Sequence, residues 1–451
     1  MDRPPLHEPI FDLGFTIYEH LAVQVFNARR VASENSLHEP LWQVGLARWA
    51  GPSAFHPIRL RLLASVSLRG RRQRLFLHLR KVPIVLLLFF IAAGGHSQNS
   101  PGPATIARTT TNVLVSWTGI GTLQSAGELA GAWNDVLEAP RPFPRSPTNG
   151  QEYFRVASKW STRAELPEAN SEMGVAELEG KIYVLGGYPA SRVTVNTVQV
   201  YDSSNNTWRL TRPLLLGVNH PMPAVANKKV YVIGGQTDTG SAYVNTVQEF
   251  DPLTTNWTYK ATMPTARSAG AAAVIGDLIY VAGGRPPRGS DFAVYNVTSN
   301  TWQSLPNLPT QRNHIAACAI DGRIYVVGGR LAAGFTSAMT NVLEVFDPST
   351  RQWSTRAPMP TVRGGINGLA AHGLFYVFGG EGPNGVFDEM EMYSPTLNRW
   401  YQLEPLPVAV HGVTGSAFLN NWIHLPGGGT ATGGSSGGTL HQVFYVEGIN
   451  P

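Results

Sequence analysis

The chain has 451 residues, including 47 glycines, 33 prolines and one cysteine. This composition is typical of a loop-rich β protein, and a single cysteine excludes an intramolecular disulfide and a multi-cysteine metal site. Residues 1–81 carry 12 Lys or Arg against 6 Asp or Glu, whereas the remainder carries 23 against 24. The net charge of +5 therefore comes from the N-terminal part, and the rest lacks the basic excess expected of a nucleic-acid-binding protein.

A signal-like segment lies inside the N-terminal region. Residues 69–81 contain six cations and no acid, and the 12 residues 82–93 (VPIVLLLFFIAA) carry no charge. This order is typical of an export signal, and the apolar core is short for a membrane span, which needs about 20 residues. Two interpretations explain its internal position. Either the start is set too far upstream and residues 1–68 are not made or are an unstructured extension, or residues 69–95 are a signal anchor.

We favour the upstream start, because a short core fits cleavage better than anchoring. It predicts a mature N-terminus shortly after Ala93 and an exported protein in the periplasm, at the cell surface or outside the cell. Contact with a membrane is expected only if Val82–Ala93 remains as an uncleaved anchor.

Two short segments follow. Residues 96–111 contain Pro and small polar residues and are predicted to be a linker. Residues 112–156 alternate apolar and polar positions between glycine turns, which predicts a small β-module. Its residues SW, TLQSA, GAW and FRV are similar to short β-modules of secreted proteins from environmental bacteria, a resemblance that implies no chemistry.

Residues 157–450 repeat with a period of about 50. Each repeat contains an apolar strand that ends in a glycine doublet, such as LIYVAGG, then a second strand such as TVQVYD, a polar turn and a tryptophan. β-branched and aromatic runs bounded by turn residues predict short strands, and this period predicts a propeller with four strands in each blade. The doublets begin at Gly186, Gly234, Gly283, Gly328, Gly379 and Gly427, and the tryptophans are Trp160, Trp208, Trp257, Trp302, Trp353 and Trp400.

Doublet, aromatic residue, Asp and Trp recur together, and in this the region resembles bacterial secreted kelch-repeat proteins of the galactose oxidase-like propeller superfamily. Asn296 and Ser394 stand where Asp is usual, and the last repeat has no terminal Trp. The unpartnered segment around Trp160 precedes the first repeat. We therefore predict an all-β, six-bladed propeller in which the N-terminal strand completes the last blade, because closure removes a free sheet edge.

Cys318 lies in the strand-like run HIAACAI. The superfamily resemblance suggests a copper site beside a cross-linked cysteine. Such a site also requires a pair of tyrosines and two histidines, and the sequence does not identify them. A small buried apolar residue is the favoured interpretation. We expect no cofactor and no metal.

The segments before the first strand of each repeat are predicted to meet at one mouth of the channel. Arginine suits planar anions there, although it equally suits loop carbonyl groups of a neighbouring blade. Glu381 follows a doublet, and two roles are open for it: a general acid or base, or a partner in a salt bridge. Tyr188, Gln236, Arg285 and Arg330 share its place in other repeats. The predicted ligand-binding residues are Asn170, Ser171, His220, Ser268, Arg267, Arg312, His314, Arg363, His411 and Glu381, flanked by Asn219 and Asn313.

No catalytic template such as HExxH, GxSxG or a P-loop is present in the sequence. We therefore expect a non-enzymatic module that binds a protein or glycan through its loop face, without nucleic acid. The alternative is a metal-independent periplasmic sugar-acid enzyme that resembles kelch-type sialic-acid mutarotases, which use Arg and Glu at the channel mouth.

Overall fold

The computed structural model describes residues 104–446 and 449, with gaps at 109–111, 118–120, 129, 141, 147–151, 190, 238–241 and 435. Before residue 104 it describes only three short strands: β1 (Ser67–Leu68), β2 (Arg71–Arg72) and β3 (Val85–Leu88). Apart from these strands, the predictions for residues 1–68 and 69–95 lie outside the described residues. No helix of the described part is both long and apolar enough to cross a membrane.

The N-terminal β-module consists of two small sheets. One has the order β4 (Ala104–Arg108), β5 (Val113–Trp117), β8 (Phe143–Arg145), and the other has the order β3, β9 (Glu152–Ala157), β6 (Thr122–Ala126), β7 (Asn134–Asp135). Val115, Leu123 and Phe154 are buried between them. The predicted linker was too long, because residues 104–108 pair along their whole length with β5. Thr105 and Ile106 favour that strand.

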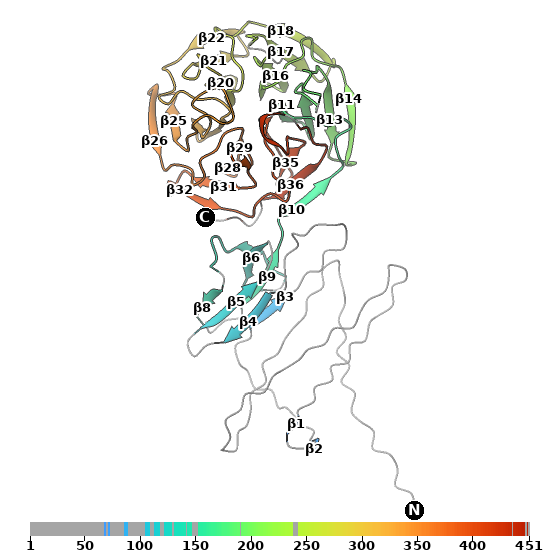
Figure 1. The fold of residues 1–451 in the computed structure, drawn as a ribbon, viewed down its shortest axis with the longest axis vertical. Helices are drawn as coiled ribbons and strands as arrows, with labels where there is room; N and C mark the ends of the chain where they lie inside the picture. Colours follow the sequence, from blue (N-terminus) through green and yellow to red (C-terminus); the bar gives the residue numbers. More distant parts are fainter. Residues whose placement is uncertain are drawn as a thin grey trace, which may run out of the picture.

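The rest of the described chain forms six sheets of four or five strands, which Figure 1 shows around a common centre. The first sheet contains β11 (Met173–Leu178), β12 (Lys181–Leu185), β13 (Val198–Asp202), β14 (Thr207–Thr211) and the short β33 (Val413–Thr414). The second contains β15 (Met222–Ala226), β16 (Lys229–Ile233), β17 (Val247–Asp251) and β18 (Asn256–Lys260). The third contains β19 (Ala271–Ile275), β20 (Leu278–Ala282), β21 (Phe292–Asn296) and β22 (Thr301–Ser304).

The remaining three sheets follow the same plan. The fourth contains β23 (Ala316–Ile320), β24 (Arg323–Val327), β25 (Leu343–Asp347) and β26 (Gln352–Arg356). The fifth contains β27 (Asn367–Ala371), β28 (Leu374–Phe378), β31 (Met390–Ser394) and β32 (Arg399–Gln402). The sixth contains β34 (Ala417–Leu419), β35 (Trp422–Pro426), β36 (His441–Tyr445) and β10 (Trp160–Arg163). A hairpin, β29 (Glu381–Gly382) and β30 (Gly385–Val386), and a 3-10 turn, Thr432–Gly434, lie in loops.

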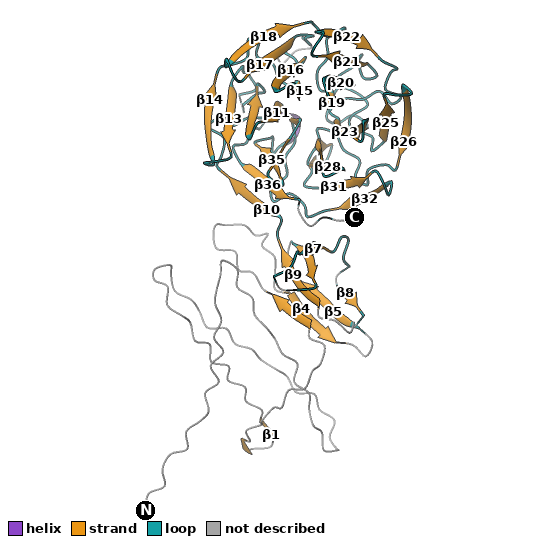
Figure 2. Cartoon of the chain, turned by 180° about the vertical axis from the view of Figure 1, so that it is seen from behind, coloured by secondary structure: helices purple, strands orange, loops and turns teal. Residues whose placement is uncertain are grey.

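The outer strand of the sixth sheet comes from the start of the repeat region. β10 pairs antiparallel with β36, with Trp160 opposite Phe444 and Arg163 opposite His441. Figure 2 shows this strand at the edge of the rounded body, next to β36 and the β-module. The pairing joins segments from the two ends of the repeat region.

Each repeat tryptophan links its sheet to the preceding one. The indole N–H of Trp208 donates to the carbonyl of Ala164 at 2.8 Å, and that of Trp257 to the carbonyl of Arg212 at 3.0 Å. These bonds place each indole ring against the preceding sheet. The other pairs are Trp302 with Ala261, Trp353 with Pro306, Trp400 with Ala357 and Trp160 with Glu404.

The doublet glycines are required by backbone geometry. Gly186 has φ 60° and Gly187 has φ 95°, in the region that favours glycine. A Cβ atom on Gly186 would lie 2.2 Å from the carbonyl oxygen of Val218 in the next repeat. The doublet therefore lets the strand end pass directly beneath the neighbouring loop.

Candidate functional site

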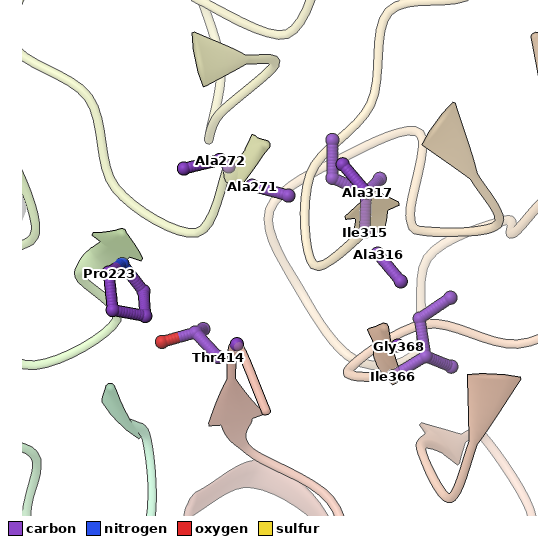
Figure 3. A pocket seen from close by; sticks show the side chains of 11 residues that line it. Pro223, Ala271, Ala272, Ile315, Ala316, Ala317, Ile366, Gly368 and Thr414 are labelled. Carbon is purple, nitrogen blue, oxygen red and sulfur yellow. The ribbon is translucent and has the colours of Figure 1, made fainter. Parts of the chain in front are cut away.

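Two places near the centre of the sheets could hold a ligand. The first is a pocket where the first strands converge, lined by Pro223, Ala271, Ile315, Ala316, Ile366 and Thr414, among others (Figure 3). None of its lining residues is titratable. The second is the layer of loops that precede these strands, and it contains a buried cluster of ionisable side chains.

A chain of backbone hydrogen bonds runs through this loop layer. His220 N donates to the carbonyl of Glu172 at 2.7 Å, Ala269 N to that of His220 at 3.0 Å, and His314 N to that of Ala269 at 2.6 Å. Gly365 and Gly412 continue the series, at 2.9 and 3.3 Å. All six residues occupy the same place in successive repeats and have positive φ. This conformation directs their side chains to one common region.

Two histidines of the layer are oriented by the asparagine before them. His220 Nδ1 lies 2.5 Å from Asn219 Oδ1, and His314 Nδ1 lies 2.5 Å from Asn313 Oδ1. The asparagine NH2 groups donate elsewhere, Asn219 to Thr194 Oγ1 and Asn313 to two loop carbonyls. The amide oxygens therefore accept from Nδ1–H, and in the neutral rings Nε2 carries the lone pair.

Arg285 lies between the two rings. Its Nη2 is 3.2 Å from His220 Nε2 and 3.4 Å from His314 Nε2, and its Nη1 donates to the carbonyl of Ala333 at 3.1 Å. The imidazole ring centroids are 5.1 Å apart. The guanidinium thus faces both lone pairs.

Two carboxylates complete the cluster. Glu172 Oε2 lies 2.9 Å from His220 Nε2 but has no hydrogen-bond partner. Glu381 forms an ion pair with Arg330, and its Oε2 accepts a bond from Gly433 N at 2.7 Å. His411 Nδ1 lies 3.3 Å from Glu381 Oε1 and 3.6 Å from Glu172 Oε1. Glu172 therefore contacts both His220 and His411 and connects the two groups of side chains.

Loops cover the cluster from outside. His411 Nε2 donates to the carbonyl of Ala431 at 2.7 Å, and Gly433 is placed against Phe335. Gly434 lies against Tyr188 and Glu172. Residues 431–434 are therefore the cover of the site, and the two glycines among them permit this close approach.

Burial sets the protonation states. It lowers the pKa of His220 and His314, and Arg285 and Arg330 lower both further, whereas the adjacent Glu172 carboxylate raises the pKa of His220. Burial alone would raise the pKa of Glu172, but its cationic and imidazole neighbours, including Arg330, outweigh it and lower the pKa.

The three arginines predicted at the mouth lie elsewhere, and this part of the prediction is corrected. Arg267, Arg312 and Arg363 are at most 1% exposed. Each guanidinium donates to backbone carbonyls of its own repeat, as Arg267 does to Val281, Gly283 and Asp291. Arg312 also pairs with Glu344, and Arg363 with Glu391. These contacts make the three arginines braces inside the sheets.

The other predicted residues divide into two groups. His220, His314, His411 and Glu381 belong to the cluster. The remaining side chains bond to nearby protein groups: Asn170 to the carbonyl of Gly186, Ser171 to the carbonyl of Tyr188 and Ser268 to Gln236.

Glu172 was missed, and Arg285 and Arg330 were assigned only a secondary place. An alignment of the repeats that extends one position further towards the first strand would have identified Glu172. Positions 172, 220, 269, 314, 365 and 412 read Glu, His, Ala, His, Gly and Gly. Glycine in two repeats indicates a backbone that turns with positive φ, and any larger side chain there points away from the strand.

Comparisons with known proteins agree with this architecture. A model of the KLHDC2/KLHL20/DRC7 Kelch-repeats domain matches residues 219–428, and a Kelch motif model matches residues 169–215. The solved structure of YjhT aligns with a TM-score of 0.55 at 15% identity, covering 64% of this chain and 98% of that chain. An identity this low shows the fold alone. The matched residues 169–215 and 219–428 are therefore kelch repeats of a β-propeller domain.

Curated relatives match over shorter stretches. Kelch-like protein 25 of Rattus norvegicus is 35% identical over 91 residues, which make up 18% of this chain and 15% of that protein. Kelch domain-containing protein SSO1033 of Saccharolobus solfataricus is 36% identical over 77 residues, or 17% and 10%. The chain thus spans a small part of the length of the curated relatives that it matches.

Proposed function

We propose that the six sheets are the blades of one closed propeller that acts as an exported recognition module. Three observations support closure: the β10–β36 pairing, the Trp bonds between neighbouring sheets and the backbone bonds around the loop layer. Together they link the sixth sheet to both the first and the fifth. A ring of this kind leaves no long unpaired edge.

The proposed ligand is a glycan that carries a carboxylate, bound at the loop face above the buried cluster. The observation that carries this proposal is the pair Arg285 and Arg330, whose buried Nε atoms have no hydrogen-bond partner. Guanidinium groups recognise carboxylates through paired N–H donors. Phe335, which contacts the cover and is partly exposed, offers apolar surface for a sugar ring. A protein ligand with an acidic side chain is the other candidate.

A screen of the full chain against acidic and neutral glycans tests this function. We expect binding of sugar acids, weakened by about 1.5–3 kcal/mol in Arg285→Gln or Arg330→Gln, because one charged hydrogen-bond partner is lost. Arg323→Gln is the matched control, since Arg323 pairs with Asp347 on a side chain that is 48% exposed. Equal affinity of all variants for every glycan that binds would contradict this site.

An enzymatic role is the second candidate. Its support is the contact of Glu381, Glu172 and His411, because a carboxylate beside an imidazole is suited to proton transfer. If the bound sugar acid is a substrate, its anomers should interconvert faster with the wild type than with Glu381→Gln. Unchanged interconversion at saturating protein would leave binding as the function.

A further inference from the structure

The two oriented histidines have the arrangement of metal ligands. A ligating histidine almost always donates its second ring N–H to a carbonyl, carboxylate or water, which fixes the tautomer and directs the other nitrogen. Asn219 and Asn313 accept from Nδ1 of His220 and His314, and both amide groups are held in place by their own bonds. Both Nε2 lone pairs are thereby directed towards Arg285.

Glu172 supplies a third ligand atom. One such atom from each of Glu172, His220 and His314 lies within 4.8 Å of the others, and all three residues are buried. Glu172 Oε2 lies only 2.9 Å from His220 Nε2. Glu172 Oε2 has no hydrogen-bond partner, and a buried carboxylate oxygen is costly unless a donor or a cation satisfies it.

Arg285 satisfies this requirement incompletely. Its Nη2 lies 3.2 and 3.4 Å from the two imidazole nitrogens, longer than a charged hydrogen bond of about 2.7–2.9 Å. It provides positive charge but leaves the Glu172 oxygen without a bond. An ion bound at about 2.0–2.2 Å from nitrogen and oxygen would bond all three ligands at once.

We propose that Glu172, His220 and His314 bind a divalent transition-metal ion of the zinc class, and that Arg285 occupies the same place when the ion is absent. Two imidazoles and one carboxylate suit zinc and its neighbours in the first row better than calcium or magnesium, which prefer all-oxygen sites. The proposal differs from our expectation of no metal. It does not depend on the glycan ligand.

Cobalt titration tests the site directly. The full chain, stripped with a chelator, should develop visible d–d absorption with one equivalent of Co²⁺, and Zn²⁺ should remove it. Glu172→Gln, His220→Gln and His314→Gln should each abolish this absorption. Asn313→Ala keeps the three ligands and should weaken binding by about 10–100-fold. Arg285→Gln removes the competing cation and should tighten binding.

Matched controls separate this site from adventitious binding. Among the described residues, His424 and His441 form a second buried histidine pair, with Nδ1 of His424 and Nε2 of His441 2.9 Å apart, and His372 is exposed. Binding lost in His424→Gln but kept in His220→Gln would overturn the proposal. Absence of cobalt absorption in both the wild type and Arg285→Gln would also overturn it. If circular dichroism shows that a ligand variant does not fold, the test relies on the other two variants. Cobalt should then bind more weakly to Asn313→Ala and more tightly to Arg285→Gln than to the wild type.

Discussion

The guanidinium of Arg363 is enclosed by protein on every side. Its nitrogens donate to the carbonyls of Gly379, Val377 and Glu389, and one pairs with the carboxylate of Glu391. Glu391 in turn accepts two bonds from Thr361. The arginine therefore ties the loop before β27 to the middle of its own sheet.

Arg363→Ala should destabilise the protein by about 3–5 kcal/mol, because it leaves Glu391 buried without its cation. Chemical denaturation measures the change. Arg399→Ala is the comparison, since Arg399 pairs with Glu138 on exposed side chains, and an exposed pair contributes about 0–1 kcal/mol. Equal losses in both variants would show that Arg363 is not a brace.

A second residue-scale prediction concerns His424 and His441. Burial lowers the pKa of His424 to about 4 and that of His441 well below its usual range, and nearby Arg163 adds to both effects. The unfolded chain therefore binds more protons than the folded one below about pH 6.5. Stability should fall as the pH is lowered from 7 to 4, by roughly 2–3 kcal/mol for His424.

Urea denaturation at several pH values measures this slope. His424→Gln should flatten it, and His372→Gln should not, because His372 is exposed. A slope unchanged by His424→Gln would assign the acid sensitivity to other groups.

At the scale of elements, the repeat pattern predicted the strands well and the site only partly. Apolar runs such as KIYVL became central strands because every residue after the lysine is buried on one face or the other. The predicted position of Arg267, Arg312 and Arg363 at the channel mouth was wrong for a different reason. Arg267 and its equivalents stand two residues before the positive-φ position. The sequence does not show that this short distance separates a guanidinium inside the sheet from a side chain in the cluster.

Strand β10 provides the element-scale prediction. A chain that begins at Glu168 lacks this strand, leaves the edge of β36 unpaired and loses Trp160, which is 8% exposed and packs on Phe444. Loss of a buried Trp costs about 3–5 kcal/mol of folding stability. The chain beginning at Glu168 should therefore melt at a much lower temperature than a chain beginning at Gln151. Identical melting temperatures would show that the sixth sheet does not need the strand.

At the scale of the whole molecule, the β-module is joined to the propeller domain by buried charge. Lys159 Nζ lies 2.8 Å from Asp135 Oδ2, and both side chains are at most 3% exposed. Glu404, from the loop after β32, accepts bonds from Ser158 and from the backbone of Lys159. Leu137 of the module packs on the core that contains Trp160. Module and domain are therefore expected to unfold together.

Lys159→Met tests this coupling. The variant leaves Asp135 buried without its cation, and we expect a loss of about 3–5 kcal/mol in a single unfolding transition. The double variant Lys159→Met/Asp135→Leu should recover most of the loss, because a buried pair is replaced by apolar groups. Two separate calorimetric transitions in the wild type would contradict the coupling.

The pairing of β10 with β36 also orders events in time. Trp160 is synthesised about 280 residues before Phe444, its partner. At roughly 5–20 residues per second, the first strand of the domain waits tens of seconds for the last. The other sheets can form as their own repeats emerge, whereas the sixth forms only near the end of translation. Until then the ring of Trp160, which the finished fold buries, stays exposed, and this interval is when the nascent chain most needs a chaperone.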